Sequence, residues 1–204
     1  MRRARIPASL PKPYVEAFNE IIARIARSVS ASAKANVPLQ MYIAGGAAQF
    51  LHTGARVSED IDAAFSRRFI PPANLDVAYT DADGAPRVLY LDRQYNETFG
   101  LVHEDAHEDA IPLAIEGVSP DVVDVRLFSP TDLAVSKIAR FENHDREDIA
   151  ALARAGLVDA AAVRLRAEEA LAGSVGDVKR VKASIRMACR LVEENLPASP
   201  RASS

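Results

Sequence analysis

The segment MYIAGGAAQFLHTGARVSEDID, residues 41–62, decides how this chain is interpreted. It opens with an apolar run that ends in Gly45 and Gly46, and it closes with Asp60 and Asp62, two carboxylates separated by a single residue. The apolar run predicts a strand ended by glycine, and the residues after it predict a helix over roughly 47–54. The run EDIDAAF predicts a second strand.

The glycine pair predicts an anion site if the strand and helix form as expected. Two glycines leave no side chain between the backbone amides and an approaching ligand. The helix that follows adds unpaired N–H groups and the positive end of its dipole, an arrangement that suits phosphate. Most glycine pairs simply mark turns, so the two aspartates carry more weight.

Asp60 and Asp62 point to the same face of a strand, because side chains two residues apart do so, while Ile61 points to the core. Two such charges repel by about 1 kcal/mol or more unless a cation lies between them. Hard carboxylate oxygens favour Mg²⁺ or Mn²⁺. The alternative is that both residues simply face solvent on an amphipathic strand.

The remaining pattern predicts an α+β fold. An amphipathic helix is expected over residues 13–34, and short runs rich in Val, Leu, Ile and Tyr between 75 and 127 predict a mixed sheet of about five strands. After Phe128 the pattern becomes helical. Ser129 and Pro130 are expected to cap the first of several helices, and the others are predicted near 146–155, 159–172 and 177–194. We therefore expect a core over 1–128, a C-terminal helical bundle over 129–196 and a flexible tail over 197–204.

Composition narrows the class of protein. No apolar run approaches the roughly 18 to 20 residues needed to cross a bilayer, so we expect a cytoplasmic protein without a membrane partner. Cys189 is the only cysteine, which excludes an intramolecular disulfide. Residues 1–40 hold seven Lys and Arg against two Glu, whereas residues 60–124 hold fourteen Asp and Glu against four Arg. An acidic middle beside a basic flank suits a metal centre that attracts phosphate, although ordinary solvated charge gives the same pattern.

Gly45-Gly46, thirteen intervening residues and Asp60-Ile61-Asp62 together resemble the signature of the DNA polymerase beta-like nucleotidyltransferase superfamily. With Ser58 the motif becomes Ser-x-Asp-x-Asp, a form similar to the AbiEii-type nucleotidyltransferase toxins of bacterial toxin-antitoxin and phage-defence systems. The downstream segment SPTDLAVSKIARFENHDREDI also resembles motifs of that group, which place a lysine in a helix before Arg and Asp-x-x-Asp. The matching residues here are Lys137, Arg140, Asp145 and Asp148.

This resemblance implies a nucleotidyltransferase-like sheet and an enzyme that transfers NMP from an NTP to a hydroxyl, with pyrophosphate leaving. Asp60, Asp62, Lys137 and Asp148 would be catalytic, and Asp60 and Asp62 would hold Mg²⁺ or Mn²⁺. Nucleotide binding would involve Gly45, Gly46, Ser58, Lys137 and Asp145. The implied acceptor is RNA, such as tRNA, or protein, and the implied partner is a cognate antitoxin.

Two assignments remain open between alternatives. A third carboxylate, as metal ligand or base, could be Asp92 at the end of the strand RVLYLD or Asp124 within VVDVRLF; we favour Asp92 because a strand-end carboxylate is more accessible to metal. Asp145 and Asp148, three residues apart, could instead serve helix capping and salt bridges with Arg140 or Arg146.

Other functions compete with this interpretation. His103 and His107 lie four residues apart, a zinc spacing on a helix, although the surrounding Gly100 and Pro112 favour a loop. The enzyme could modify a small molecule, as antibiotic-modifying members of the superfamily do, or the chain could be a catalytically silent binding or antitoxin module. An RNA acceptor would be held by a row of basic residues that could equally be the wet face of packed helices: Arg24, Arg27, Lys179, Arg180, Lys182, Arg186 and Arg190.

Overall fold

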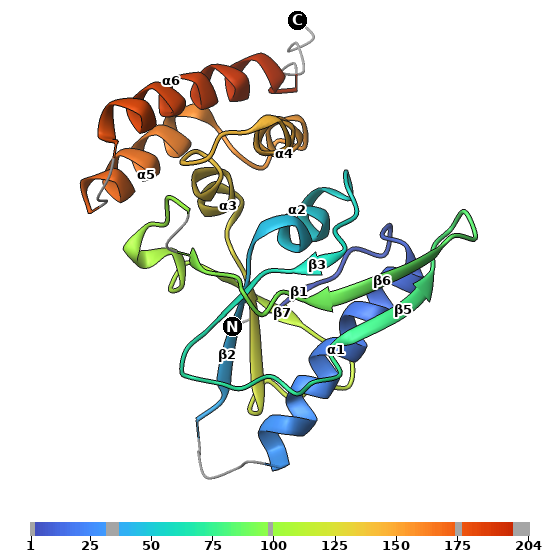
Figure 1. Cartoon of the computed structure of the whole chain (residues 1–204). Coiled ribbons are helices and arrows are strands. Elements are labelled where there is room, and N and C mark those ends of the chain that lie inside the picture. Colours follow the sequence, from blue (N-terminus) through green and yellow to red (C-terminus); the bar gives the residue numbers. More distant parts are fainter. Residues whose placement is uncertain (1–2, 32–36, 98–99, 174–176, 198–204) are drawn as a thin grey trace, which may run out of the picture. The chain divides into compact units, whose positions relative to one another are not determined.

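The computed structural model describes residues 3–31, 37–97, 100–173 and 177–197. These residues form two compact units (Figure 1). The first, the sheet unit, comprises the chain up to Asn96 together with His107–Ser129. The second, the helical unit, comprises Glu97–Ala106 together with the chain from Pro130 onward. The tail predicted over 197–204 lies outside the described residues, except for Pro197.

The sheet unit contains two sheets. The larger one has the strand order β1-β7-β8-β2-β4 and is mixed, with β2 parallel to β8 and antiparallel to β4. The smaller one has the order β3-β6-β5, with β3 parallel to β6 and β5 antiparallel to it. The strands run over Ala4–Arg5 (β1), Leu39–Ile43 (β2), Asp60–Ile61 (β3), Ala63–Phe65 (β4), Asp76–Thr80 (β5), Pro86–Leu91 (β6), Ile111–Ala114 (β7) and Val123–Leu127 (β8).

The predicted strand EDIDAAF is split into two. The chain pairs with β6 through β3, passes Asp62, and then pairs with β2 through β4. At the switch, the Ala44 N–H donates to the Asp62 carbonyl and the Asp92 N–H donates to the Ile61 carbonyl. The prediction of a single strand was therefore wrong, because consecutive backbone groups at residues 61 and 62 are taken by different neighbouring strands.

Helix α1, Lys12–Ala31, packs against β5, β6 and β8 of the sheet unit. Its apolar stripe of Phe18, Ile21, Ile22 and Ile25 is fully buried, as the three- and four-residue spacing predicts. Each of these side chains stabilises the fold by about 1.5–3 kcal/mol relative to exposure. The nine-residue helix α2, Gly45–Thr53, follows β2 directly and ends at Gly54, which has the left-handed conformation with φ 67°.

The helical unit contains α3, Pro130–Ser136, α4, Asn143–Arg154, α5, Ala160–Ala172, and α6, Val178–Asn195. Pro130 is the first residue of α3, where its missing N–H costs nothing. Asp159 and Asp177 cap α5 and α6 by accepting hydrogen bonds from the N–H groups of Ala162 and Arg180. Cys189 is buried on α6. The α+β class, with its five-stranded mixed sheet and C-terminal helices, is confirmed.

Candidate functional site

The site begins where β2 gives way to α2. Ala44 is extended, with φ −124° and ψ −161°, and Gly45 follows in the left-handed region with φ 55°. This sharp change of direction lets the helix start immediately at the strand end, and glycine adopts it without the steric cost that a Cβ would add. The hydrogen bond from the Ala44 N–H to the Asp62 carbonyl, 2.9 Å long, fixes the aspartate segment against this turn.

Both glycines are required by what lies beside them. A Cβ on Gly45 would overlap the Asp62 carboxylate, with Cγ only 2.6 Å away. A Cβ on Gly46 would overlap the Ser58 hydroxyl and would lie 3.8 Å from Asp60 Oδ1. The structure therefore brings Gly45, Gly46, Ser58, Asp60 and Asp62 together within the sheet unit.

A serine orients one of the two carboxylates. The buried Ser58 donates a 2.6 Å hydrogen bond from its hydroxyl to Asp60 Oδ1, so its proton is directed at the aspartate. Asp60 and Asp62 are half-buried, and Ile61 between them is fully buried, as a strand with one polar face requires. The predicted nucleotide-binding role of Ser58 stays a prediction; in the structure it orients Asp60.

Strand β6 adds two polar side chains to the same edge. Tyr90 is the register partner of Asp60, and Asp92 follows two residues later, accepting a 2.8 Å hydrogen bond from the Gln94 N–H through Oδ1. The charge of Asp60 raises the pKa of the Tyr90 phenol, with further contributions from partial burial and from the charges of Asp92, Glu59 and Asp62. Sequence reasoning missed Tyr90, although its position two residues before Asp92 in RVLYLD places both on one strand face.

A second tyrosine lies beneath this edge. Tyr14 on α1 is buried, packs edge-on against Phe50 with ring centroids 4.7 Å apart, and has no hydrogen-bond partner for its hydroxyl among the described residues. Burial is the main reason that its pKa is raised, with further contributions from Tyr79 and from the negative charge of Asp60. The phenol is therefore neutral at physiological pH.

Asp124, the alternative third carboxylate, has a different environment. It is buried on β8, where Oδ1 lies 2.6 Å from Arg3 Nη1 and Oδ2 lies 2.9 Å from Arg126 Nε. Its register partner is Gln40, three residues before the end of β2. Both oxygens of Asp124 thus bind guanidinium groups, and the choice of Asp92 as the third carboxylate stays a prediction.

The donor set suits a hard divalent cation. Two half-buried carboxylates stand beside a backbone turn that has no space for a Cβ, and Mg²⁺ is usually bound by one or two carboxylates together with substrate phosphates and water. Within the described ranges, no three His, Cys, Asp or Glu side chains gather closely enough to hold a metal ion. Asp60, Asp62 and Asp92 thus do not form such a group, and the metal role of Asp92 stays a prediction.

The downstream residues of the resemblance all belong to the helical unit. The buried Lys137 ammonium lies 2.7 Å from Asp148 Oδ2. Arg140 binds Asp145 through two hydrogen bonds, and Asp145 also accepts the Glu142 N–H in a capping box at the start of α4. Lys137 lies in a turn after α3 rather than in a helix, because α3 ends at Ser136. The expectation of a helical lysine was wrong.

The pKa of Asp145 reflects its contacts in the helical unit. Burial by itself would raise its pKa, but hydrogen bonds from Arg140 and the Glu142 N–H, with the charges of Arg140 and Lys137, lower the pKa below its ordinary value. The capping and salt-bridge alternative therefore describes the observed contacts of Asp145. Its predicted nucleotide-binding role stays a prediction.

The histidine pair does not share a helix. Only Glu104–Ala106 forms a short 3₁₀ turn between His103 and His107. The His103 Nδ1 accepts the Asp105 N–H at 3.1 Å, and the His107 ring stacks on Tyr42 with centroids 4.1 Å apart. The helical zinc spacing considered from the sequence is therefore wrong.

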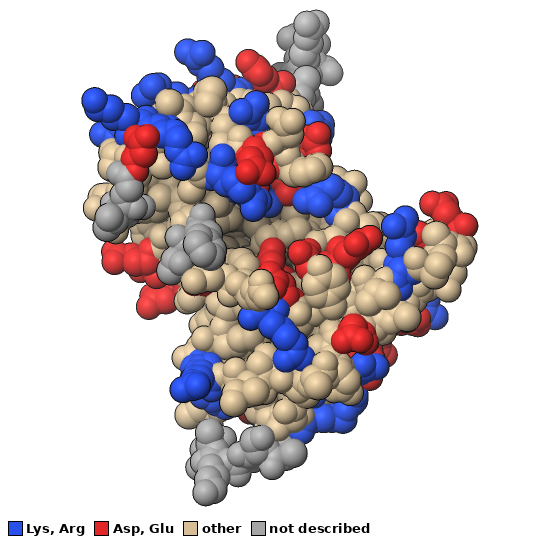
Figure 2. Space-filling view, viewed as in Figure 1, with Lys and Arg blue, Asp and Glu red and all other residues tan. Residues whose placement is uncertain are grey.

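The basic residues of the sequence separate into two sets. Arg24 and Arg27 are engaged by Glu20, and Arg24 also donates to the carbonyls of Asn74 and Asp76. On α6, in contrast, five cations are exposed; they are Lys179, Arg180, Lys182, Arg186 and Arg190. Figure 2 shows many Lys and Arg side chains on the surface of the helical unit.

Comparison with known proteins identifies the class. Residues 20–191 match the model of the family DUF6036, described as a nucleotidyltransferase of unknown function, and the chain belongs to this family. The matched region includes the glycine pair, the aspartate pair and the four residues of the downstream motif. No curated protein and no solved structure gives a significant match. Among the described residues, no helix is long and apolar enough to span a membrane.

Proposed function

We propose that this chain is an active, metal-dependent nucleotidyltransferase that transfers NMP from an NTP to a hydroxyl group of RNA, such as tRNA, or of protein. The proposal includes an AbiEii-like role as the toxin of a toxin-antitoxin or phage-defence system with a cognate antitoxin. The family match supports the general class. The acceptor, the metal and the biological system are the additional content of the proposal.

One observation carries the proposal. The carboxylate of Asp62 and the hydroxyl of Ser58 occupy the space that side chains at 45 and 46 would fill. The backbone amides at the start of α2 and the two aspartates therefore share one small region, where a triphosphate and its cation are needed together. An ordinary glycine turn would not require a carboxylate against one glycine and, against the other, a serine that binds a second carboxylate.

Each residue of the site has a separate role in the proposed reaction. Gly45 and Gly46 leave the amides at the N-terminus of α2 open to the β- and γ-phosphates, and Ser58 holds Asp60 in place through its 2.6 Å hydrogen bond. Asp60 and Asp62 would hold Mg²⁺, which when bound neutralises phosphate charge and stabilises the transition state of nucleotidyl transfer. Asp92 would accept the proton of the attacking hydroxyl.

The exposed cations of α6 support a polyanionic acceptor. Five positive side chains on one helix would bind phosphates, release counterions and make binding fall as salt rises. Lys137 would contribute a positive charge to nucleotide binding. For that role its ion pair with Asp148, at 2.7 Å, has to be shared or broken by substrate.

The test incubates the purified chain with each labelled NTP, Mg²⁺ and either total RNA or cell lysate, in parallel with Asp62→Ala. We expect label on one macromolecular class with the natural chain and none with the variant. A chelator should abolish the labelling. Calorimetry with Mg²⁺ and NTP provides a second readout that needs no acceptor.

Each alternative has its own result. Equal labelling by the natural chain and Asp62→Ala would contradict the chemistry. Calorimetry without Mg²⁺-dependent NTP binding would instead favour a silent binding module. RNA binding that does not weaken with salt would remove the role proposed for α6.

A further inference from the structure

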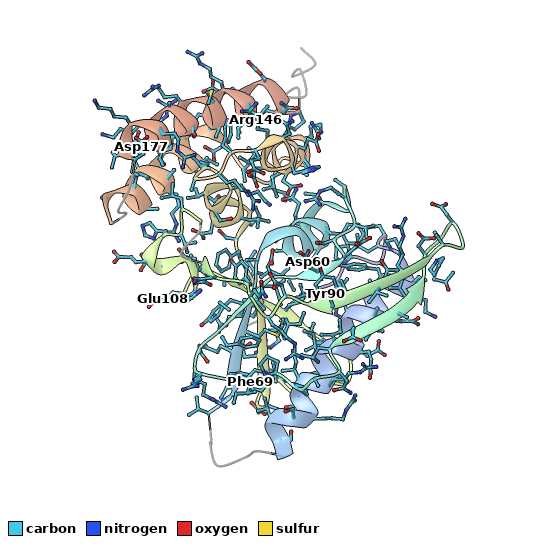
Figure 3. All side chains as sticks on the ribbon, viewed as in Figure 1. Asp60, Phe69, Tyr90, Glu108, Arg146 and Asp177 are labelled. Carbon is cyan, nitrogen blue, oxygen red and sulfur yellow. The ribbon has the colours of Figure 1, made fainter. Side chains whose placement is uncertain are left out.

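Tyr90 presents a hydroxyl at the edge of the candidate site. It stands opposite Asp60 in the parallel pairing of β3 with β6, and partners in such a pair project to the same side of the sheet. Figure 3 labels both residues, and Figure 2 shows carboxylates gathered in the same part of the sheet unit. The alternation of β6 confirms the direction, because Leu89 and Leu91 are buried whereas Tyr90 is 43% exposed.

The hydroxyl of Tyr90 makes no hydrogen bond to any described residue, which separates it from Tyr42, whose hydroxyl donates to Gln40. The ring also lines a surface groove of about 370 Å³ in the sheet unit, together with Val88, Asp92 and Gln94. The phenol is therefore accessible to a reagent that approaches along the open face of the β3-β6-β5 sheet. It is also a group of the chemical type that the proposed reaction consumes.

We propose that Tyr90 is an acceptor of the chain's own reaction, so that the protein nucleotidylates itself on this phenol. The inference rests on the proposed function. The phenolic oxygen attacks the α-phosphorus of the NTP, the bond between that phosphorus and the bridging oxygen to the β-phosphate breaks, and pyrophosphate leaves with its electron pair. The product is a phosphodiester between Tyr90 and the nucleoside.

Asp92 provides the base. It follows the last residue of β6 and lines the same groove as Tyr90, and its Oδ1 already accepts the Gln94 N–H at 2.8 Å, which orients the carboxylate. The second oxygen is left to take the phenolic proton as the new bond forms. The groups required for the transfer therefore come from two neighbouring strands and the segments next to them. Asp60 on β3 lies beside the proposed phosphate-binding turn, and Tyr90 on β6 is followed by Asp92.

Modification would change the surface on which the acceptor has to lie. A nucleotidyl group on Tyr90 would extend over the groove that Val88 and Gln94 line and would add a negative charge beside Asp60. We expect the modified chain to be blocked toward other acceptors. Self-modification would then act as an off-switch that depends on the NTP supply.

The experiment incubates the full chain with Mg²⁺ and each NTP and measures intact mass, followed by peptide mass spectrometry to locate the adduct. We expect the mass of one nucleotidyl group on Tyr90, absent from Tyr90→Phe. The matched control is Tyr79→Phe, which removes a hydroxyl from the opposite face of the same sheet, where Tyr79 packs edge-on against Tyr14. That control should be labelled like the natural chain.

A second readout does not depend on turnover. Tetranitromethane nitrates exposed tyrosines, and Mg²⁺ with an α,β-nonhydrolysable NTP should protect Tyr90 while leaving nitration of Tyr79 unchanged. Equal nitration of Tyr90 with and without the nucleotide would overturn the inference, provided that calorimetry shows binding.

Different results would contradict the self-acceptor role of Tyr90 and the proposed function. If the chain labels RNA or protein in lysate but carries no adduct on Tyr90, the self-acceptor role is wrong and the proposed function stands. If neither Mg²⁺-dependent NTP binding nor any transfer occurs, the proposed function is wrong and the self-acceptor role falls with it.

Discussion

The buried carboxylates of the helical unit and the carboxylates of the candidate site in the sheet unit differ in their partners. In the helical unit Asp132, Asp145 and Asp148 are buried, and each lies within 2.7 Å of an Arg or Lys nitrogen. In the sheet unit Asp60 accepts a neutral hydroxyl and has no cationic partner among the described residues, and Asp92 accepts only a backbone N–H. Internal neutralisation keeps a buried carboxylate stable in the fold, whereas carboxylates without it are the ones to which the proposed function assigns a cation.

The largest expected effect separates activity from stability. Asp60→Asn keeps an oxygen for the Ser58 hydroxyl but removes one charge from the proposed metal site. We expect nucleotidyl transfer to fall by at least about 10²-fold, the size of losing one electrostatic group in an active site. The free energy of unfolding, measured with urea, should stay the same or rise because a repulsion is relieved.

Asp83→Asn is the matched control for this prediction. It neutralises an exposed carboxylate in the turn between β5 and β6 of the same unit, so the net charge changes equally. Its transfer rate should equal that of the natural chain. A comparable loss in both variants would mean that overall charge, rather than the site at Asp60, supports the reaction.

In the helical unit, removing a charged partner should lower the stability of the fold. Lys137→Met leaves Asp148 buried beside an apolar side chain, and breaking a buried ion pair by removing one partner costs about 3–5 kcal/mol. Urea denaturation should show this loss. The exposed pair Lys12–Glu16 serves as comparison, because Lys12→Met should cost no more than about 0.5 kcal/mol.

A double variant sharpens the interpretation of this pair. Lys137→Met with Asp148→Leu should recover part of the stability lost in the single variant, since an apolar pair can replace an ion pair. If stability recovers but Mg²⁺-dependent NTP binding does not, the pair also serves the nucleotide. If Lys137→Met leaves the free energy of unfolding unchanged, the stabilising role of the pair is wrong.

Two glycine substitutions test whether NTP binding depends on the lack of space for a side chain at Gly45. Gly45→Ala combines left-handed strain of about 1–2 kcal/mol with a collision against the Asp62 carboxylate, so both stability and NTP binding should fall. Gly84→Ala has similar strain at φ 82° but meets nothing within 4 Å. It should lose the same strain energy in urea denaturation while keeping full NTP binding. Equal loss of NTP binding in both would remove the steric argument for the turn.

The sequence predicted those parts of the site that depend on local spacing. Alternation around Ile61 predicted its burial between two less buried aspartates, and the glycine pair predicted the strand-to-helix turn. It did not predict the change of sheet at Asp62, because that depends on which strands arrive from elsewhere in the chain. For the same reason Tyr90 was missed: its pairing with Asp60 joins residues thirty positions apart, and nothing local indicates it.

In the helical unit the sequence indicated the residues but not the contacts that they make. Spacing located α4 and both of its aspartates, but spacing cannot tell a ligand from a cap. The decision came from Arg140 and the Glu142 N–H, which meet Asp145 only once the turn before α4 has formed with Phe141 at φ 53°. The resemblance in sequence order named these residues but did not indicate their contacts.

The smallest expected effect concerns pH. Asp145 has a folded-state pKa below its ordinary value, so its ionised form stabilises the fold above the unfolded pKa of about 3.9 and this contribution is lost as pH falls through the folded value. Asp145→Asn should therefore lower the free energy of unfolding at pH 7 and should flatten its decline below about pH 4. Arg140→Gln, which removes the guanidinium that lowers the pKa of this carboxyl, should flatten the decline in the same way. If either variant kept the acid limb of the natural chain in urea denaturation at several pH values, the ion pair between Arg140 and Asp145 would not control the stability of the fold in acid.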